Sequence, residues 1–243
     1  MKFAIIAAGE GSRLSAEGVT EPKPLVTVGG EHIIDRLMRI FMRNGADEID
    51  VICNDRTNLV SEHLLGIEED GLDGYPIPLQ MHVKSTPSSM HSFFELSPRL
   101  EGHAFVLTTV DTIFREDEFS EYVKAFRQCL SDGYDGLMGV TSYVDDERPL
   151  YVATDDGMGI TGFLDDDARH LCKYVSGGIY GLAPNAIDTL RACMSRGESR
   201  MRNFQRGLLR DGRRLKAYAF SKVLDIDHKA DIAKAEEFLR ASH

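Results

Sequence analysis

The sequence predicts an α/β protein with a mostly parallel central sheet, helices on both faces of that sheet and a smaller β-rich lobe. Two observations support this prediction. Through residues 1–133, short apolar runs alternate with amphipathic segments of helical period, which is typical of parallel strands joined by crossover helices. Between residues 134 and 182, short apolar runs follow one another without long amphipathic segments between them. That change indicates an antiparallel extension of the sheet.

The first half of the chain supplies the parallel strands. Residues 3–8 form an almost wholly apolar run that ends at Gly9, as expected of a central strand buried on both faces. Residues 31–45 carry apolar side chains at helical spacing and end in Asn44-Gly45, which predicts an amphipathic helix with a glycine stop. The same reasoning predicts strands at 49–53, 79–83 and 104–110 and helices at 57–65, 88–96 and 118–130.

The second half is expected to form the β-rich lobe and then to return to helices. We expect a hairpin turn at Gly157-Met158-Gly159, because paired glycines favour tight turns. The expected elements are strands at 136–140, 150–153, 160–163, 178–182 and 215–220 and helices at 185–195, 201–210 and 229–240. We expect one domain over residues 1–243, made of the segments 1–133, 134–222 and 223–243.

Charge and cysteine content limit the classes of partner. The chain has 28 Lys and Arg against 39 Asp and Glu, a net charge of −11 at pH 7, which argues against nucleic acid or an anionic membrane as a partner. The four cysteines are far apart, so we expect reduced thiols in a cytoplasmic protein and neither a zinc nor a redox motif. Apolar runs are too short for a membrane span, and the N-terminus does not fit a signal peptide.

The most informative segment is glycine-rich and follows the first strand. It runs AAGEGSRL from Ala7 to Leu14, and EPKPL follows at residues 21–25. Glycines let the backbone approach a phosphate closely, and successive N–H groups can cradle an anion. Arg13 can bind phosphate oxygens in bidentate fashion, and Lys23 adds a compact charge between two prolines. The pattern fits neither a Walker A loop nor a dinucleotide fingerprint.

Carboxylates recur at two places that could hold a cation. Asp111 follows the apolar strand at 104–110, and the carboxyl ends of strands are where open α/β sheets bind ligands. Asp225 and Asp227 are two residues apart, so on an extended chain they share one face. The alternative for each is a role as helix cap or turn residue.

Together, GxGSRL and PKPL resemble the signature of the sugar-phosphate nucleotidyltransferase superfamily, whose Rossmann-like domain is the nucleotide-diphospho-sugar transferase fold. The resemblance continues through VTVGG at residues 26–30 and Asn44-Gly45. It implies that residues 1–133 bind a nucleoside triphosphate (NTP). It further implies that residues 134–222 form the acceptor side, and that residues 223–243 supply a metal-binding segment and a closing helix.

The resemblance also implies a set of substrate contacts. Ser88 and Ser89 fall where relatives carry a base-contacting loop, although a helix N-cap explains them equally well. The segment VSGGIY at 175–180 resembles the acceptor-side loop and places the acceptor near Gly177 and Gly178, with Lys173 either near its phosphate or on the surface. The implied nucleotide-binding residues are Ala7, Ala8, Gly9, Gly11, Ser12, Arg13, Lys23, Ser88 and Ser89.

For catalysis, the resemblance implies Arg13, Lys23, Asp111 and Asp225, with Mg²⁺ as the cofactor. Asp111 would hold the metal ion together with Asp225, Asp227 or both, and carboxylates are the ligands that Mg²⁺ prefers. Two positions depart from the family. Val110 stands where many relatives have Gly, and His228-Lys229 replaces the usual Thr-Pro.

The reaction implied is Mg²⁺-dependent transfer of a nucleotide to a sugar 1-phosphate, which gives a nucleoside diphosphate sugar and pyrophosphate. A cytidylyltransferase for phosphocholine or another small alcohol phosphate is the alternative within the family. A non-catalytic nucleotide sensor is the alternative outside it, and a glycosyltransferase would have to use Asp165–Asp167. The nucleobase, the acceptor and a homodimeric state stay open.

Overall fold

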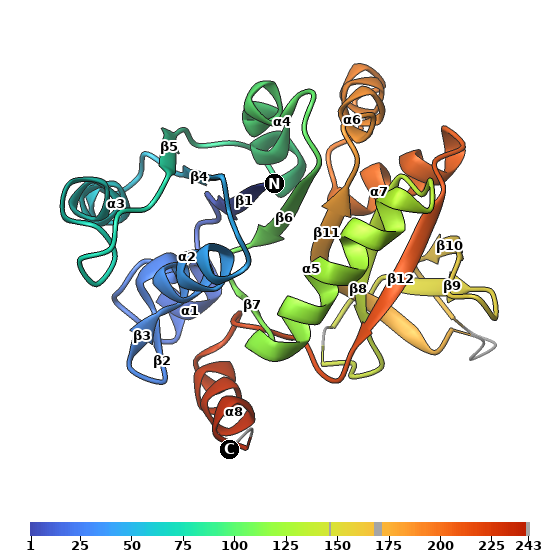
Figure 1. The fold of residues 1–243 in the computed structure, drawn as a ribbon. Helices are drawn as coiled ribbons and strands as arrows, with labels where there is room; N and C mark the ends of the chain where they lie inside the picture. The colour runs from blue at the N-terminus through green and yellow to red at the C-terminus, as the bar shows by residue number, and fades with distance from the viewer. Residues whose placement is uncertain (146, 168–171, 242–243) are drawn as a thin grey trace.

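The computed structural model describes residues 1–145, 147–167 and 172–241, and within them nine strands form one sheet (Figure 1). The strands of this sheet are β1 (Lys2–Ala7), β4 (Glu48–Cys53), β5 (Leu79–Val83), β6 (Phe105–Thr109), β8 (Gly136–Thr141), β9 (Tyr151–Thr154), β10 (Ile160–Leu164), β11 (Tyr174–Leu182) and β12 (Leu215–Phe220). Two short antiparallel pairs lie outside it: β2 (Thr27–Val28) with β3 (Glu31–His32), and β7 (Thr112–Ile113) with β13 (Leu224–Asp225).

Helices cover both faces of the sheet. They are α1 (Ser12–Ala16), α2 (Ile33–Arg43), α3 (Asn58–Asp70), α4 (Ser89–Leu100), α5 (Glu116–Ser131), α6 (Ala186–Ser195), α7 (Met201–Arg210) and α8 (Lys229–Arg240), with a 3-10 turn η1 at Lys23–Leu25. Apolar side chains of α2, α3 and α5 pack on one face, and those of α4, α6 and α7 pack on the other (Figure 1). No helix in the described ranges is long and apolar enough to cross a bilayer.

The sheet is parallel in its first half and becomes antiparallel in its second. Strands β5, β4, β1 and β6 are neighbours in that order and run parallel. Strand β11 then pairs antiparallel with both β6 and β8, and β12 lies parallel beside β8. Strands β9 and β10 form a hairpin that joins the start of β11. The predicted α/β fold is therefore confirmed, and its β-rich part is continuous with the parallel strands.

Strand β1 shows why the central strands are apolar throughout. Phe3 and Ile5 pack into the cluster formed with α2 and α5, whereas Ala4 and Ile6 pack into the cluster formed with α4. Successive side chains of a strand point to opposite faces, so a strand covered on both faces must be apolar at every position.

Helices α3 and α4 end four or more residues later than the sequence predicts. Helix α3 continues to Asp70 because the buried stripe extends through Leu64 and Ile67. Helix α4 continues to Leu100 with Pro98 inside it. A proline cannot donate a backbone hydrogen bond to the carbonyl four residues earlier. Here the Ser97 hydroxyl donates to that carbonyl, Phe94 O, at 2.7 Å.

Two residues of the acidic run at 165–167 make specific contacts, although Asp165 and Asp166 are exposed to solvent. Asp165 forms ion pairs with Arg202 at 2.5 Å and with Arg206 at 2.8 Å. Asp167 is buried and accepts from the Cys172 backbone N–H at 2.8 Å. These contacts give both acids a structural role.

Candidate functional site

The glycine-rich segment forms a turn that ends in helix α1. Strand β1 ends at the buried Ala7, followed by the buried Ala8 and the exposed Gly9. Gly11 precedes α1 with φ +60°, and a Cβ there would lie 3.2 Å from Lys23 Cβ. Glycine is therefore required at position 11 by the left-handed backbone and by the close approach of Lys23.

Lys23 lies at the centre of the site, held in η1 by the prolines on either side. Its Nζ donates to Asp111 Oδ2 at 2.5 Å and to Asp227 Oδ1 at 2.7 Å. Burial by itself would lower the pKa of this ammonium, but Asp111 and Asp227 outweigh that effect and raise the pKa above its ordinary value. Lys23 is consequently a permanent cation that joins two acidic segments.

Arg13 extends this network toward solvent. Its guanidinium donates to Asp227 Oδ2 at 2.9 Å, so each oxygen of Asp227 is bonded to a different cation. The side chains of Arg13 and Asp227 remain 56% and 42% exposed, so this pair costs little to separate. Arg13 is therefore open to an incoming anion, whereas Lys23 is only 10% exposed behind its two carboxylate partners.

Backbone pairing brings Asp111 and Asp225 together. Asp111 follows β6, and Asp225 in β13 is paired with Thr112 in β7. The Ile226 N–H also donates to the Asp111 carbonyl at 3.1 Å. Burial raises the pKa of the Tyr180 hydroxyl to about 12, and the charges of Asp225 and Asp111 add to that shift. Both carboxylates therefore act on the same buried hydroxyl.

Gly177 and Gly178 form an irregularity in β11, where the register with β8 shifts between Ser176 and Ile179. Gly178 has φ +70°, and a Cβ there would lie 3.2 Å from Thr112 Oγ1. The backbone of β11 thus passes close to the segment that follows Asp111.

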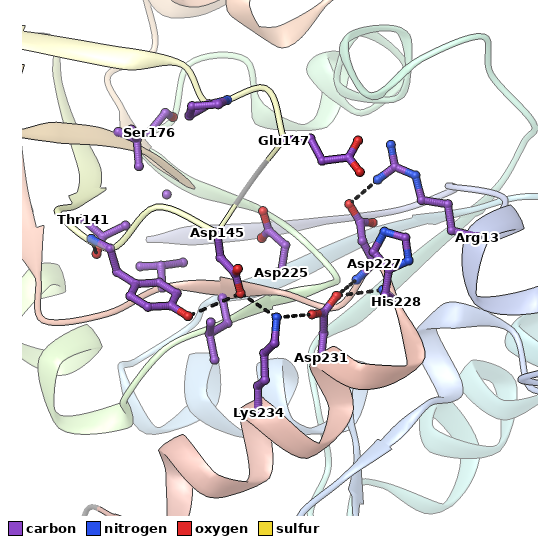
Figure 2. Close-up of a pocket in the computed structure, with 16 residues that line it drawn as sticks. Arg13, Thr141, Asp145, Glu147, Ser176, Asp225, Asp227, His228, Asp231 and Lys234 are labelled. Carbon is purple, nitrogen blue, oxygen red and sulfur yellow. Dashed lines mark hydrogen bonds and ion pairs between the residues drawn. The ribbon is translucent and has the colours of Figure 1, made fainter. Parts of the chain in front are cut away.

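Beside these residues lies a cavity of about 210 Å³, here called the acidic pocket (Figure 2). Lys234 projects from α8 and bonds Asp145 at 2.8 Å and Asp231 at 3.2 Å, and the Tyr143 hydroxyl donates to Asp145 at 3.3 Å. The lining residues are Arg13, Thr141, Tyr143, Asp145, Glu147, Pro149, Val175, Ser176, Gly177, Val223, Leu224, Asp225, Asp227, His228, Asp231 and Lys234.

His228, at the family's Thr position, caps helix α8. Its backbone N–H donates to Asp231 Oδ2 at 2.7 Å, and its ring Nδ1 bonds Glu17 Oε1 at 2.6 Å. The hydrogen bond to Glu17 raises the pKa of His228, and the same bond lowers the pKa of Glu17. His228 therefore fixes the start of α8 and ties it to Glu17, the residue that directly follows α1.

Three residues named from the sequence have local roles away from this network. Ser88 caps α4, where its hydroxyl accepts from the His91 N–H at 3.4 Å and donates to the Ser199 carbonyl. Ser89 is exposed in the first turn of that helix. Lys173 is exposed with its Nζ 5.2 Å from the centre of the Tyr174 ring, and it is not among the residues that line the acidic pocket.

Sequence reasoning missed several residues that the fold brings to the site. Glu17, Asp145, Glu147 and Lys234 come from segments without a recognisable motif, and Asp231 lies in the segment that resembles the family's metal-binding segment but was given no role there. A partial signal was present, because Asp231 and Lys234 are three residues apart on one predicted helix and such residues share a helix face.

Similarity to known proteins extends along nearly the whole chain. The family model described as nucleotidyl transferase matches residues 2–242. A UTP–glucose-1-phosphate uridylyltransferase of Haloferax volcanii is 24% identical over 245 residues, which cover 99% of this chain and 97% of that protein. A glucose-1-phosphate cytidylyltransferase of Salmonella typhimurium is 33% identical over 63 residues, which are 26% of this chain and 24% of that relative's length.

Solved structures share the same fold. A Bacillus anthracis protein assigned as a glucose-1-phosphate thymidylyltransferase superposes with a TM-score of 0.83 at 20% identity, covering 100% of this chain and 96% of its own. The CTP:phosphocholine cytidylyltransferase of Streptococcus pneumoniae has a TM-score of 0.74 at 16% identity, covering 98% of each chain. An inositol-1-phosphate CTP transferase from T. maritima has a TM-score of 0.75 at 18% identity, and the match covers 98% of this chain and 97% of that protein's chain.

Proposed function

The chain belongs to the nucleotidyl transferase family and is a transferase enzyme, and from this premise we propose that it joins an NTP to a sugar 1-phosphate with release of pyrophosphate. One observation carries the proposal. Lys23 bonds Asp111 and Asp227 at 2.5 and 2.7 Å beside a cavity large enough for a small acceptor.

The nucleotide side of the proposal rests on the turn between β1 and α1. Backbone N–H groups of Gly9, Gly11 and Ser12 would face the triphosphate, and Ala7 and Ala8 would lie beside the nucleobase. Arg13 and Lys23 would then exchange their bonds to Asp227 for bonds to phosphate oxygens, since both cations already converge there. The capping geometry of Ser88 favours a structural role for that residue over a base contact.

The acidic residues fit a divalent cation, and Mg²⁺ is the ion we propose. Asp111 and Asp225 offer carboxylate oxygens from backbone segments that β7 and β13 hold together, which is the donor type that Mg²⁺ selects. Asp227 is the weaker candidate, because Arg13 and Lys23 bond its two oxygens. When bound, the ion would neutralise charge on the phosphates.

The proposed chemistry is an in-line displacement. An oxygen of the acceptor phosphate forms a bond to the α-phosphorus of the NTP, and the bond from that phosphorus to the bridging oxygen breaks, so pyrophosphate leaves. The attacking oxygen is already anionic at pH 7, so the protein need not remove a proton. Arg13 and Lys23 would orient the two anions and offset the charge that accumulates in the transition state.

For the acceptor, we propose the acidic pocket, with the backbone of Gly177 and Gly178 at its edge. Asp145 and Glu147 can accept hydrogen bonds from sugar hydroxyls. The Haloferax volcanii relative is named for glucose 1-phosphate, which supports a sugar. A phosphorylated amino alcohol is the second candidate, because carboxylates outnumber cations among the lining residues and Tyr143 adds an aromatic ring.

A substrate panel tests this proposal. Each of ATP, CTP, GTP, UTP and dTTP is incubated with Mg²⁺ and either glucose 1-phosphate, another sugar 1-phosphate or phosphocholine, and pyrophosphate is measured. We expect release with a sugar 1-phosphate, and loss of release with EDTA and in Asp111→Asn. Release with phosphocholine alone would establish the second candidate, whereas metal-dependent NTP binding without release would indicate a nucleotide sensor.

The thiols support a proposed location in the cytoplasm. Cys53, Cys129 and Cys193 are buried and unpaired with one another, and Cys172 is a free thiol at intermediate exposure. Free thiols of this kind persist in reducing compartments. Quantitative labelling of four thiols in the unfolded, unreduced protein taken from cells would support this location, and disulfides would oppose it.

A further inference from the structure

Two histidines and an aspartate converge between α2 and α3. His32 directly precedes α2, Asp35 lies in the first turn of α2 and His63 lies on α3. One potential ligand atom from each side chain lies within 4.8 Å of the other two. These three residues, here called the His-Asp-His cluster, are not among the residues that line the acidic pocket.

The tautomer of His32 leaves a nitrogen able to bind a metal ion. Its Nδ1 is 2.6 Å from the Leu25 carbonyl oxygen. A carbonyl oxygen can only accept a hydrogen bond, so Nδ1 carries the proton and Nε2 keeps its lone pair. Histidines that bind metals commonly donate their other N–H to a backbone carbonyl in this way, which fixes the ring.

Asp35 and His63 complete the cluster from two packed helices. His63 Nε2 donates to Asp35 Oδ1 at 2.7 Å, and the side chains are 26% and 13% exposed. The rings of His32 and His63 meet edge to face with their centres 5.2 Å apart. The three side chains are therefore held on a rigid scaffold and remain reachable from solvent.

We propose that the His-Asp-His cluster binds a first-row transition metal ion of the Zn²⁺ type. Zn²⁺ accepts two imidazoles and one carboxylate as ligands, whereas Mg²⁺ does not favour imidazole nitrogen. Ligand bonds of about 2.0 Å place tetrahedral ligands roughly 3.3 Å apart. His63 Nε2 and Asp35 Oδ1, now 2.7 Å apart, must therefore separate by about 0.6 Å. As Nε2 binds the ion, its proton moves through solvent to Nδ1 of the same ring.

A bound ion would link three segments that are near the proposed active site. It would join α3 to the start of α2 and, through His32, to the Leu25 carbonyl. Leu25 ends the η1 turn that begins with Lys23. With three protein ligands, the fourth position is left to water or another small ligand.

Cobalt spectroscopy on the full chain tests the site without using catalysis. Co²⁺ is titrated into the protein in excess Mg²⁺, which occupies sites made of carboxylates alone. We expect one equivalent of Co²⁺ to give the intense visible bands of a four- or five-coordinate site with nitrogen ligands, and one equivalent of Zn²⁺ to abolish them. Absence of such bands in the wild type would overturn the proposal.

Variants assign the bands to the cluster. His63→Ala and Asp35→Asn should each weaken Co²⁺ binding by at least about 10-fold, whereas His103→Gln, which changes an exposed histidine, should bind like the wild type. Circular dichroism confirms that each variant is folded, and His63→Gln replaces His63→Ala if the latter is not. Bands that persist in both cluster variants, or that disappear in Asp111→Asn instead, would place the ion elsewhere and contradict the proposal.

Discussion

Lys23 Nζ lies 2.5 Å from Asp111 Oδ2, although the two residues are 88 positions apart in the chain. The ammonium therefore neutralises the carboxylate that we propose as a metal ligand. Asp227, 204 positions from Lys23, completes the arrangement at 2.7 Å. Three distant segments thus meet in one network of ion pairs, and we propose that phosphates and a divalent cation replace these pairs during the reaction.

Lys23→Ala is expected to reduce kcat/KM for NTP by about 10²–10³-fold, the cost of removing one donor that stabilises transition-state charge. Pyrophosphate release under steady-state conditions measures it. Lys124→Ala is the matched control, because Lys124 is 67% exposed and pairs with Glu121 three residues away on α5. Equal kcat/KM values in the two variants would show that Lys23 does not contribute to catalysis.

Asp225 and Asp227 should respond differently to loss of charge. Asp225→Asn is expected to raise the Mg²⁺ concentration needed for half-maximal turnover by at least about 10-fold, as when metal coordination is disturbed. Asp227→Asn should mainly alter KM for NTP, because Asp227 bonds Arg13 and Lys23. A Mg²⁺ titration of both variants measures the difference. If Asp227→Asn raised the Mg²⁺ requirement and Asp225→Asn did not, Asp227 would be the metal ligand instead.

Gly11→Ala should destabilise the protein and disturb Lys23. A left-handed backbone costs an L-residue roughly 1–2 kcal/mol, and the added Cβ would lie 3.2 Å from Lys23 Cβ. Gly18→Ala is the control, because Gly18 has φ +86° but no atom within 4 Å of such a Cβ. Urea unfolding should show a loss of stability in both variants, and a raised KM for NTP should appear in Gly11→Ala alone. A normal KM there would show that the turn does not position Lys23.

Asp145 should contribute to acceptor affinity. Asp145→Asn removes a charge from the acidic pocket and weakens the bond to Lys234, so we expect KM for the acceptor to rise by about 10-fold, equivalent to about 1.4 kcal/mol. KM for NTP should stay unchanged, since Asp145 bonds Tyr143 and Lys234, whereas Arg13 bonds Asp227 (Figure 2). A change confined to the KM for NTP would contradict the acceptor assignment.

Asp50 should make stability depend on pH. Its side chain is fully buried, and burial raises its pKa from 3.8 to about 6 in spite of the Arg99 guanidinium at 2.5 Å. The folded protein therefore holds this proton to higher pH than the unfolded chain does, and stability falls as pH rises from about 4 to about 6. Compared with Asp50→Asn, wild-type protein should lose up to about 3 kcal/mol over this interval. Parallel pH profiles for the two proteins would contradict the raised pKa.

The regular elements could be predicted because their patterns are local. Strand β5, helices α7 and α8 and strand β12 begin and end as the sequence predicts, since apolar period and turn residues define them. Strands β2, β3, β7 and β13 have two residues each, which is too short to show a period. Helix α4 continues through Pro98 because the Ser97 hydroxyl donates the hydrogen bond that the proline nitrogen cannot. The spacing of apolar residues in the sequence does not predict this replacement.

The candidate site was predictable in part. The glycine-rich turn, Arg13, Lys23, Asp111 and Asp225 follow from motif and position, whereas the bonds that join them depend on contacts between distant segments. Glu17 contacts His228 across 211 positions, and nothing near either residue in sequence predicts the pair. The His-Asp-His cluster could not be predicted from the sequence, because His63 meets His32 and Asp35 only when α3 packs against α2.

The central claim is nucleotide transfer to a phosphorylated acceptor, and ³¹P NMR of the reaction tests it most directly. Protein, Mg²⁺ and the NTP preferred in the substrate panel are mixed with glucose 1-phosphate or, in parallel samples, with each other acceptor of that panel, and the phosphorus signals are followed. We predict a pyrophosphate signal together with two mutually coupled signals from the new diphosphate, none of which forms with Asp111→Asn. Unchanged substrates with every acceptor, or nucleoside monophosphate and pyrophosphate without a coupled product, would contradict the account.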